Sequence, residues 1–231
     1  MDEKSLAISF GESLTEEVSG LVGEYAELGL DALVEDGLFK DVPVISTITA
    51  VYRIGKSFRE RHHLAKLISF LNAINKGIVD EEKRNSYREK FTSNEKFRNQ
   101  ELEYIMVLID RYISLDKPQM LAKLYLAYLD EKIIWEEFTM YAEVVDRFLL
   151  LDCRTLVSEA TTFHTLRDSG ADIILRLVAL GLMAEDKSIT VSEARKTIKG
   201  ETRSASQMSS DSKKKKYKRT DFGRKLADIL R

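Results

Sequence analysis

The sequence predicts a mainly α-helical protein, in which a multi-helix bundle is followed by a smaller module with a short β-hairpin. The chain of 231 residues contains 11 Gly and 2 Pro, too few for the many tight turns of a β-sandwich or barrel. Hydrophobic residues make up 44% of the chain and charged residues 32%, which is typical of a soluble protein large enough to bury a core. Apolar residues also recur at helical spacing along most of the chain.

Changes in composition predict three regions. Residues 1–40 form an acidic amphipathic arm, residues 41–150 a helical bundle, and residues 151–231 a C-terminal module that carries a flexible basic loop at 199–216. Acids dominate the arm and bases dominate the C-terminal end, although the net charge is only −2. Such a separation of charge indicates association, either between the two ends or with different partners, rather than a particular fold.

The acidic arm is predicted to be an amphipathic helix that opens with a capping box. Ser13 is followed three residues later by Glu16, and apolar residues then recur at helical spacing as far as Gly37. Several glycines make this helix marginal by itself, so it needs a surface to pack on. That surface is either the basic half of the next helix or a separate protein. The residues that we predict to dock a protein partner are Glu24, Glu27 and Asp31.

Pro43 predicts the start of the next helix, because proline fits the first turn. Residues 42–52 are uncharged, whereas residues 53–66 are strongly basic. We predict a bundle helix whose basic end reaches solvent or pairs with the arm. The alternative is a membrane-surface segment in which apolar side chains enter the headgroup region; these are Val44, Ile45, Ile48 and Val51. The uncharged part is well short of the ~20 residues that span a bilayer.

Four more helices are predicted in the bundle region. The preceding helix ends at Gly77, and a short, highly charged helix covers residues 80–91. A capping box, Thr92 with Glu95, opens the next helix, and Asp116 caps the one after it. A single helix covers residues 133–151. Its aromatic stripe of Phe138, Tyr141 and Phe148 is predicted to lie in the core.

The C-terminal module has a different pattern. One or two short helices in residues 151–170 precede a helix at 171–183, a segment rich in Thr, Val and Ile at 188–198, a strand near Tyr217 and a final helix capped by Thr220. This order resembles a winged-helix module, in which two strands form the wing. The resemblance completes the predicted fold: a multi-helix bundle followed by a small winged-helix-like module with a short β-hairpin wing.

The helix at 171–183 argues against the reading of DNA sequence. Its only charged residues are Asp172 and Arg176, whereas base contacts need several Arg, Lys, Asn or Gln side chains on one face. The basic wing could instead neutralise phosphates without reading bases. The residues predicted for this contact are Lys213, Lys214, Lys215, Lys216, Lys218 and Arg219. The alternative is a solvated, disordered loop.

Two features of the sequence carry a further resemblance: the segment LAKLYLAYLDEKIIWEEF at 121–138, and the combination of RLVALGLM at 176–183 with TDFGRKL at 220–226. In these segments and in its layout, the whole chain resembles uncharacterised bacterial helical proteins of the abortive infection alpha family. The resemblance implies a role in phage defence, and it implies no site residues.

Enzymatic signatures are missing from the sequence. There is no phosphate-binding Gly-rich loop, dinucleotide fingerprint or zincin motif. Adjacent His62 and His63 cannot face one metal from a helix, and His164 is remote in sequence. Neighbouring acids, Glu101 with Glu103 and Glu136 with Glu137, do not face each other on a helix and are predicted to be solvated. We therefore predict no catalytic activity, no metal and no cofactor.

The sequence thus predicts a non-enzymatic protein–protein interaction component, a regulator or effector of a bacterial antiviral or stress response. The alternatives are a nucleic-acid-binding protein that uses the basic wing and a membrane-active effector that uses the Pro43 helix; a homo-oligomer is also left open. A single cysteine, Cys153, predicted to be buried, and no signal-peptide pattern in residues 1–13 predict a cytoplasmic protein.

Overall fold

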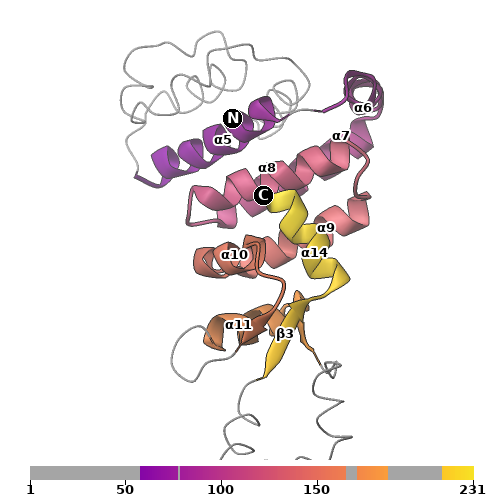
Figure 1. The fold of residues 1–231 in the computed structure, drawn as a ribbon. Coiled ribbons are helices and arrows are strands. Elements are labelled where there is room, and N and C mark those ends of the chain that lie inside the picture. Colours follow the sequence, from indigo (N-terminus) through magenta and orange to yellow (C-terminus); the bar gives the residue numbers. More distant parts are fainter. Residues whose placement is uncertain (1–57, 78, 165–170, 187–214) are drawn as a thin grey trace, which may run out of the picture. The chain divides into compact units, whose positions relative to one another are not determined.

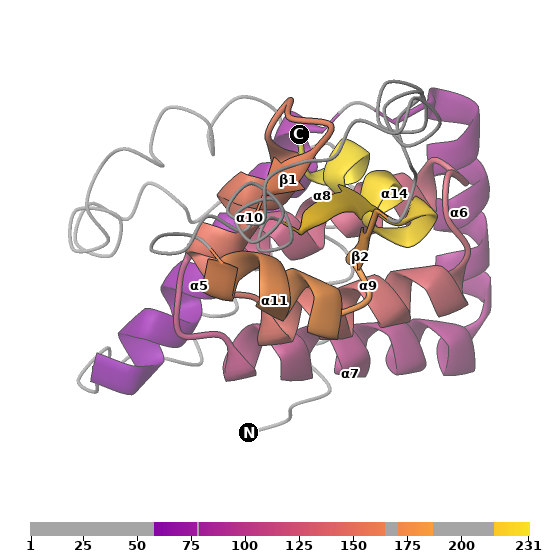
Figure 2. The same cartoon turned by 60° about the horizontal axis from the view of Figure 1, so that its bottom comes forward.

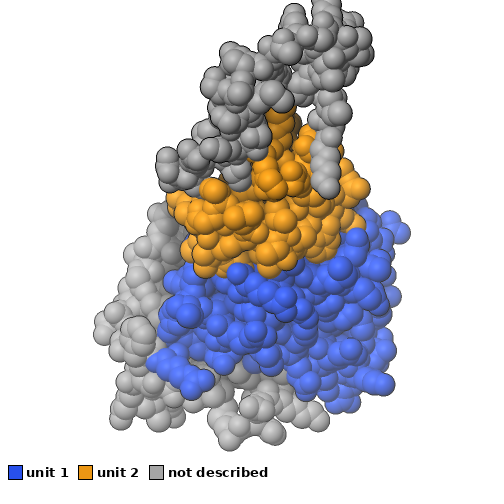
Figure 3. Space-filling model, turned by 90° about the horizontal axis from the view of Figure 1, so that it is seen from below, with its two compact units in different colours: residues 1–147 blue, residues 148–231 orange. Residues whose placement is uncertain are grey.

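The computed structural model describes residues 58–77, 79–164, 171–186 and 215–231 (Figure 1). The described part is mainly α-helical, with one small sheet, as predicted. Two compact units divide the chain at 147/148, three residues before the predicted boundary (Figure 3). The acidic arm, most of the Pro43 helix, the 188–198 segment and the wing up to residue 214 lie outside the described residues.

Unit 1 contains five described helices. They are α5 (Phe58–Lys76), α6 (Glu81–Ser93), α7 (Glu95–Arg111), α8 (Asp116–Leu129) and α9 (Trp135–Arg147). The central helix is α8, which packs chiefly on α5 and α9. Helices α6 and α7 form a further pair that also contacts α8 and α9. The core side chains include Leu67, Phe70, Ile105, Leu121, Tyr125 and Phe138. The predicted burial of Phe138, Tyr141 and Phe148 is confirmed.

Asp80 and Asn94 set the starts of α6 and α7. The Asp80 carboxylate accepts the backbone amide of Glu82 at 3.1 Å, as expected for an N-cap. The Asn94 side chain caps α7 by accepting the Phe97 amide at 3.0 Å. The predicted capping box at Thr92 is therefore wrong, because α6 continues through Thr92, whose hydroxyl donates to the Arg88 carbonyl.

Two further predicted boundaries also need correction. Asp116 does not cap α8 but is its first residue, and its amide donates to the hydroxyl of Ser114 at 3.0 Å. The single helix predicted at 133–151 is two helices, because α9 ends at Arg147 and Leu149 adopts an extended backbone before the next helix starts. Helical spacing of apolar residues continues across this break, which is why the pattern concealed it.

Unit 2 combines three described helices with a three-stranded antiparallel sheet (Figure 2). Its elements are α10 (Leu150–Val157), β1 (Phe163–His164), α11 (Ala171–Ala179), β2 (Met183–Glu185), β3 (Lys216–Arg219) and α14 (Asp221–Leu230). Strand β3 lies between β1 and β2. In the register, Tyr217 opposes Phe163, and Arg219 opposes Met183.

The turn after α11 joins the helix to the sheet. Helix α11 ends at Ala179 rather than at the predicted residue 183, because Gly181 takes a left-handed φ of 73° and the chain enters β2 at Met183. The predicted cap of the last helix is confirmed: the Thr220 hydroxyl accepts the Gly223 amide at 2.9 Å. The same hydroxyl donates to the Gly181 carbonyl at 2.7 Å, which fastens α14 to this turn.

Candidate functional site

The exposed residues of helix α11 are Asp172, Leu175 and Ala179. Ile174 and Leu177 are buried, whereas the side chain of Leu175 is 54% exposed. Arg176 is the one side chain of this helix that belongs to a type that reads bases, and Asp172 is its other charged residue. The exposed surface of α11 therefore suits contact with another apolar surface better than contact with nucleic acid.

Arg176 is held by two acids. Its Nε and Nη2 atoms donate to the carboxylate of Asp152 on α10 at 3.0 and 2.7 Å, and its Nη1 atom donates to Asp172 at 2.9 Å. Asp152 is only 1% exposed. The hydrogen bonds that Arg176 donates, first to Asp152 and then to Asp172, raise the pKa of Arg176. The hydrogen bond from Arg176 lowers the pKa of Asp172. Arg176, the cation of α11, thus stabilises the packing of α11 on α10 within unit 2.

The described lysines of the wing face acids at the β2 end. Lys215 lies 3.2 Å from the Glu185 carboxylate, and Lys218 lies 3.3 Å from that of Asp186. Lys216 is half-buried in β3, and its carbonyl accepts the Asp186 amide. Exposed ion pairs of this kind are weak, so they do not prevent these lysines from contacting a phosphate. Phosphate contact by these lysines therefore stays a prediction. Lys213 and Lys214 lie outside the described residues.

Arg219 does not fit its predicted phosphate contact. It is 9% exposed, and its guanidinium donates to the carbonyl oxygens of Leu156, at 2.6 Å, and Ala160, at 2.8 Å, and to that of Ser158. Burial lowers its pKa. Arg219 instead ties β3 to the end of α10, and the prediction failed because a basic run in the sequence does not distinguish the inward from the outward face of a strand.

Glu101 lies at the centre of a buried polar cluster that sequence reasoning missed. It is 2% exposed, not solvated as predicted. Its carboxylate accepts the hydroxyls of Tyr87 and Tyr128, each at 2.6 Å, and that of Tyr125 at 3.2 Å. Burial raises the pKa of Glu101, and the hydrogen bonds from the tyrosines oppose this shift only in part. Burial likewise raises the pKa of each tyrosine.

Lys66 on α5 is also buried, whereas the basic end of this helix was predicted to reach solvent or to pair with the acidic arm. Its Nζ atom donates to the carbonyl oxygens of Asp110, at 2.6 Å, and Tyr112, at 2.9 Å, at the end of α7. The neighbouring His63 lies 3.2 Å from the Asp110 carboxylate, and burial lowers the pKa of this histidine. Lys66 therefore caps the C-terminal end of α7, and its buried ammonium group does not form a ligand-binding site.

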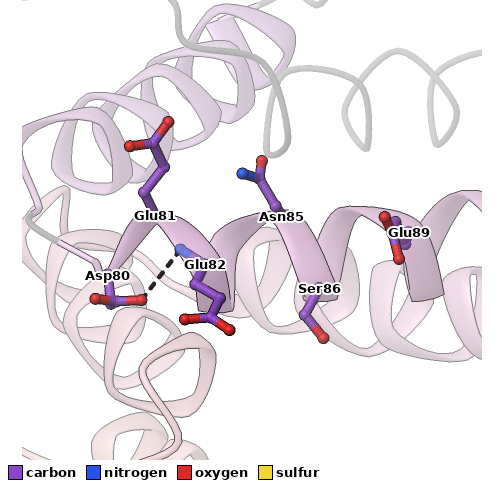
Figure 4. Close-up of a pocket in the computed structure, with 6 residues that line it drawn as sticks. All are labelled: Asp80, Glu81, Glu82, Asn85, Ser86 and Glu89. Carbon is purple, nitrogen blue, oxygen red and sulfur yellow. Dashed lines mark hydrogen bonds between the residues drawn. The ribbon is translucent and has the colours of Figure 1, made fainter.

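An open depression lies along the exposed face of α6 (Figure 4). The residues that line it are Asp80, Glu81, Glu82, Asn85, Ser86 and Glu89. All come from one helix and its cap, and they provide neither a nucleophile with an adjacent base nor a cation for an anionic substrate. This acidic surface gives no basis for an active site.

Two sets of predicted site residues lie outside the described residues: the docking acids Glu24, Glu27 and Asp31, and the membrane-segment residues Val44, Ile45, Ile48 and Val51. Of the helices that the structure describes, none is sufficiently long and apolar to cross a bilayer. The described residues also contain no metal-binding group of three or more His, Cys, Asp or Glu.

No protein-family model, curated protein or solved structure matches this chain.

Proposed function

We propose that the protein acts by binding another protein, and that unit 2 is a winged-helix-like module whose α11 face makes the contact. The order of helix, strand, helix, two strands and helix supports this assignment, as does a sheet in which β3 pairs with both β1 and β2. Helix α11 stands immediately before the β2–β3 pair, which is the position of the recognition helix in such modules.

The observation that carries this proposal is the chemistry of α11. Its exposed face presents Leu175, while Arg176 is bound by Asp152 and Asp172. An apolar side chain at the centre of a contact gains free energy by leaving water, whereas a DNA contact would need cations or amides there. We propose, following the family resemblance, that this contact serves a bacterial antiviral response.

A photo-crosslinking experiment in the source cells tests the contact. A photoreactive amino acid at position 175 should capture a specific protein, and the same amino acid at the exposed Ile113 of unit 1 should not. The captured protein is then purified and titrated against the wild type, Leu175→Asp and Ile113→Asp. We expect Leu175→Asp to weaken binding at least about tenfold, or about 1.4 kcal/mol, and Ile113→Asp to leave it unchanged.

Equal binding by wild type and Leu175→Asp would refute the α11 contact. The nucleic-acid alternative predicts a different result: affinity for a short DNA duplex that falls steeply with salt, is lost when Lys215 and Lys218 become Ala, and is indifferent to Leu175→Asp. The link to phage defence is tested separately, since Leu175→Asp should abolish protection of cells in a phage challenge if the contact is needed for it.

A further inference from the structure

Helix α6 covers a buried carboxylate that the protein-binding proposal does not use. Tyr87, on α6, donates its hydroxyl to Glu101 on α7, and Tyr125 and Tyr128, both on α8, complete the set of donors. Among the described residues, the cation that lowers the pKa of Glu101 is Lys90, which is also on α6. Its influence on this pKa is smaller than that of burial or of the three tyrosine hydrogen bonds. The negative charge is therefore solvated by phenols and is not neutralised by a close cation.

Helix α6 is attached to the rest of unit 1 by few buried side chains. Phe91 is its one fully buried residue, and Tyr87 is half-buried. Near its first turn, Lys83 donates to the Asp130 carbonyl at 2.7 Å. The opposite face is the exposed acidic surface of Figure 4. Few buried apolar side chains hold this helix, which is the property of segments that open locally before the whole domain unfolds.

We propose that α6 is a proton-controlled cover: protonation of Glu101 holds α6 closed, and ionisation of Glu101 favours an open state in which water reaches the carboxylate. Opening removes Tyr87 from the cluster. Water then replaces its hydroxyl and hydrates the charge, which stabilises the ionised form more than the protonated form.

The direction of the response follows from the charges around Glu101. In the closed state, burial raises the pKa of Glu101 above its ordinary value of 4.5, which the hydrated open state restores. The closed state therefore binds the proton more tightly, and opening releases it. The opening equilibrium should be constant below about pH 4.5, rise by up to about tenfold per pH unit until the raised pKa is passed, and then level off. Tyr87, Tyr125 and Tyr128 stay neutral, because burial raises the pKa of each.

Opening also breaks aromatic contacts, so the closed state remains the major one. The Tyr87 ring lies 6.1 Å from Phe97 and from Tyr125, and 6.3 Å from Tyr128. Each such pair contributes about 0.5–1.5 kcal/mol beyond the burial of area. The proton changes the population of a minor open state and leaves the closed structure as it is.

Hydrogen exchange of the full chain tests the cover. The exchange rates of wild type and Glu101→Gln are compared between about pH 5 and pH 8. The wild-type rate is divided by the rate of the variant at each pH, which cancels the intrinsic pH dependence of exchange. We expect the ratio for α6 amides to rise with pH, by up to about tenfold per unit within the titration range. The ratio for α9 amides should stay flat. Glu103→Gln, an exposed acid two positions along α7, is the matched control and should behave as the wild type.

A ratio for α6 that does not change with pH would overturn the proposal. The proposal would also fail if Glu103→Gln altered the pH dependence of α6 exchange as Glu101→Gln does. Tyr87→Phe provides a second variant that keeps the carboxylate. It removes a hydrogen bond that lowers the pKa of Glu101, so α6 should open more readily and its pH response should extend to higher pH. Tyr104→Phe is its control, because the Tyr104 hydroxyl donates to the Thr139 carbonyl and not to Glu101. Unchanged α6 exchange in Tyr87→Phe would also refute the cover.

Discussion

Among the residues that the structure describes, each unit buries one carboxylate, and the two units hold it in different ways. In unit 1, Glu101 is 2% exposed and accepts the hydroxyls of three tyrosines. In unit 2, Asp152 is 1% exposed and accepts a paired contact from the Arg176 guanidinium. Phenols solvate a charge but do not cancel it, whereas a guanidinium does both. Unit 1 therefore keeps a buried group that responds to protons, and unit 2 keeps an ion pair that links two helices.

The largest expected effect comes from removing the acceptor in unit 1. Glu101→Leu leaves the hydroxyls of Tyr87, Tyr125 and Tyr128 without their carboxylate. The Tyr87 and Tyr125 hydroxyls still contact each other, so two donors lose their acceptor, and each buried unsatisfied donor costs about 1–3 kcal/mol. We expect unit 1 to lose about 3 kcal/mol or more of unfolding free energy. The fluorescence of Trp135, the one tryptophan of the chain, reports this in urea, since its ring lies 5.4 Å from that of Tyr128.

The matched control is Glu103→Leu, which changes an exposed acid on the same helix and should have little effect. A loss below about 1 kcal/mol in Glu101→Leu would mean that the tyrosine hydroxyls find other acceptors, and the contrast between the two buried acids would then disappear.

Substituting one glycine in each unit by alanine compares how well the two units tolerate added side-chain volume. A Cβ at Gly223 of α14 would overlap the backbone carbonyl of Leu182, which cannot turn away, whereas a Cβ at Gly77 of unit 1 would meet only the side chain of Leu126. We expect Gly223→Ala to destabilise unit 2 by about 2–3 kcal/mol and Gly77→Ala to cost less than about 1.5 kcal/mol. The reactivity of Cys153, the single cysteine, which is 8% exposed, reports the opening of unit 2. Equal effects would mean that the backbone at Leu182 adjusts.

Removing the charge but not the shape of each buried acid should affect the units in opposite ways. Asp152→Asn leaves the Arg176 guanidinium without its closest anion, so the urea midpoint of unit 2 should fall. Glu101→Gln keeps an acceptor for the tyrosines and removes an uncompensated charge, so the midpoint of unit 1 near neutral pH should rise or stay the same. A fall in both midpoints would show that Glu101 is stabilised by a cation after all.

The sequence predicted those parts of the fold that depend on neighbouring residues. The cap at Thr220, the charged helix near 80–91 and the burial of Phe138 follow from local spacing, and the structure has them. The caps at Thr92 and Asp116 failed because each residue lies inside a helix: α6 continues through Thr92, and Asp116 is the first residue of α8. Asn94 caps α7 instead, by accepting the Phe97 amide. Competition between adjacent capping residues is decided by the preceding turn, which a single motif does not describe.

The two buried acids depend on contacts between distant residues, which local patterns do not give. Glu101 and Tyr87 are 14 residues apart, and Asp152 and Arg176 are 24 apart. A signal for Glu101 was present: it precedes Leu102 and lies one helical turn before Ile105, on the buried face of α7. Arg219 shows the same limit, since only the pairing of β3 between two strands reveals that its side chain points inward.

The smallest expected effect, about 1.4 kcal/mol for each unit of pKa shift, is the pH dependence of unit 1. The pKa of Glu101 is raised by burial, so its contribution to stability is complete below about pH 4.5 and is lost as the pH rises through the raised pKa. His63 acts in the opposite direction: burial lowers its pKa, so its contribution is present above about pH 6.5 and is lost as the pH falls through the lowered value. The difference between wild type and Glu101→Gln, followed by Trp135 fluorescence, isolates Glu101. That difference should grow with pH in unit 1, and the corresponding difference for unit 2, followed by the reactivity of Cys153, should stay at zero. A difference that shrinks with pH in unit 1 would mean that the folded state stabilises the ionised form of Glu101.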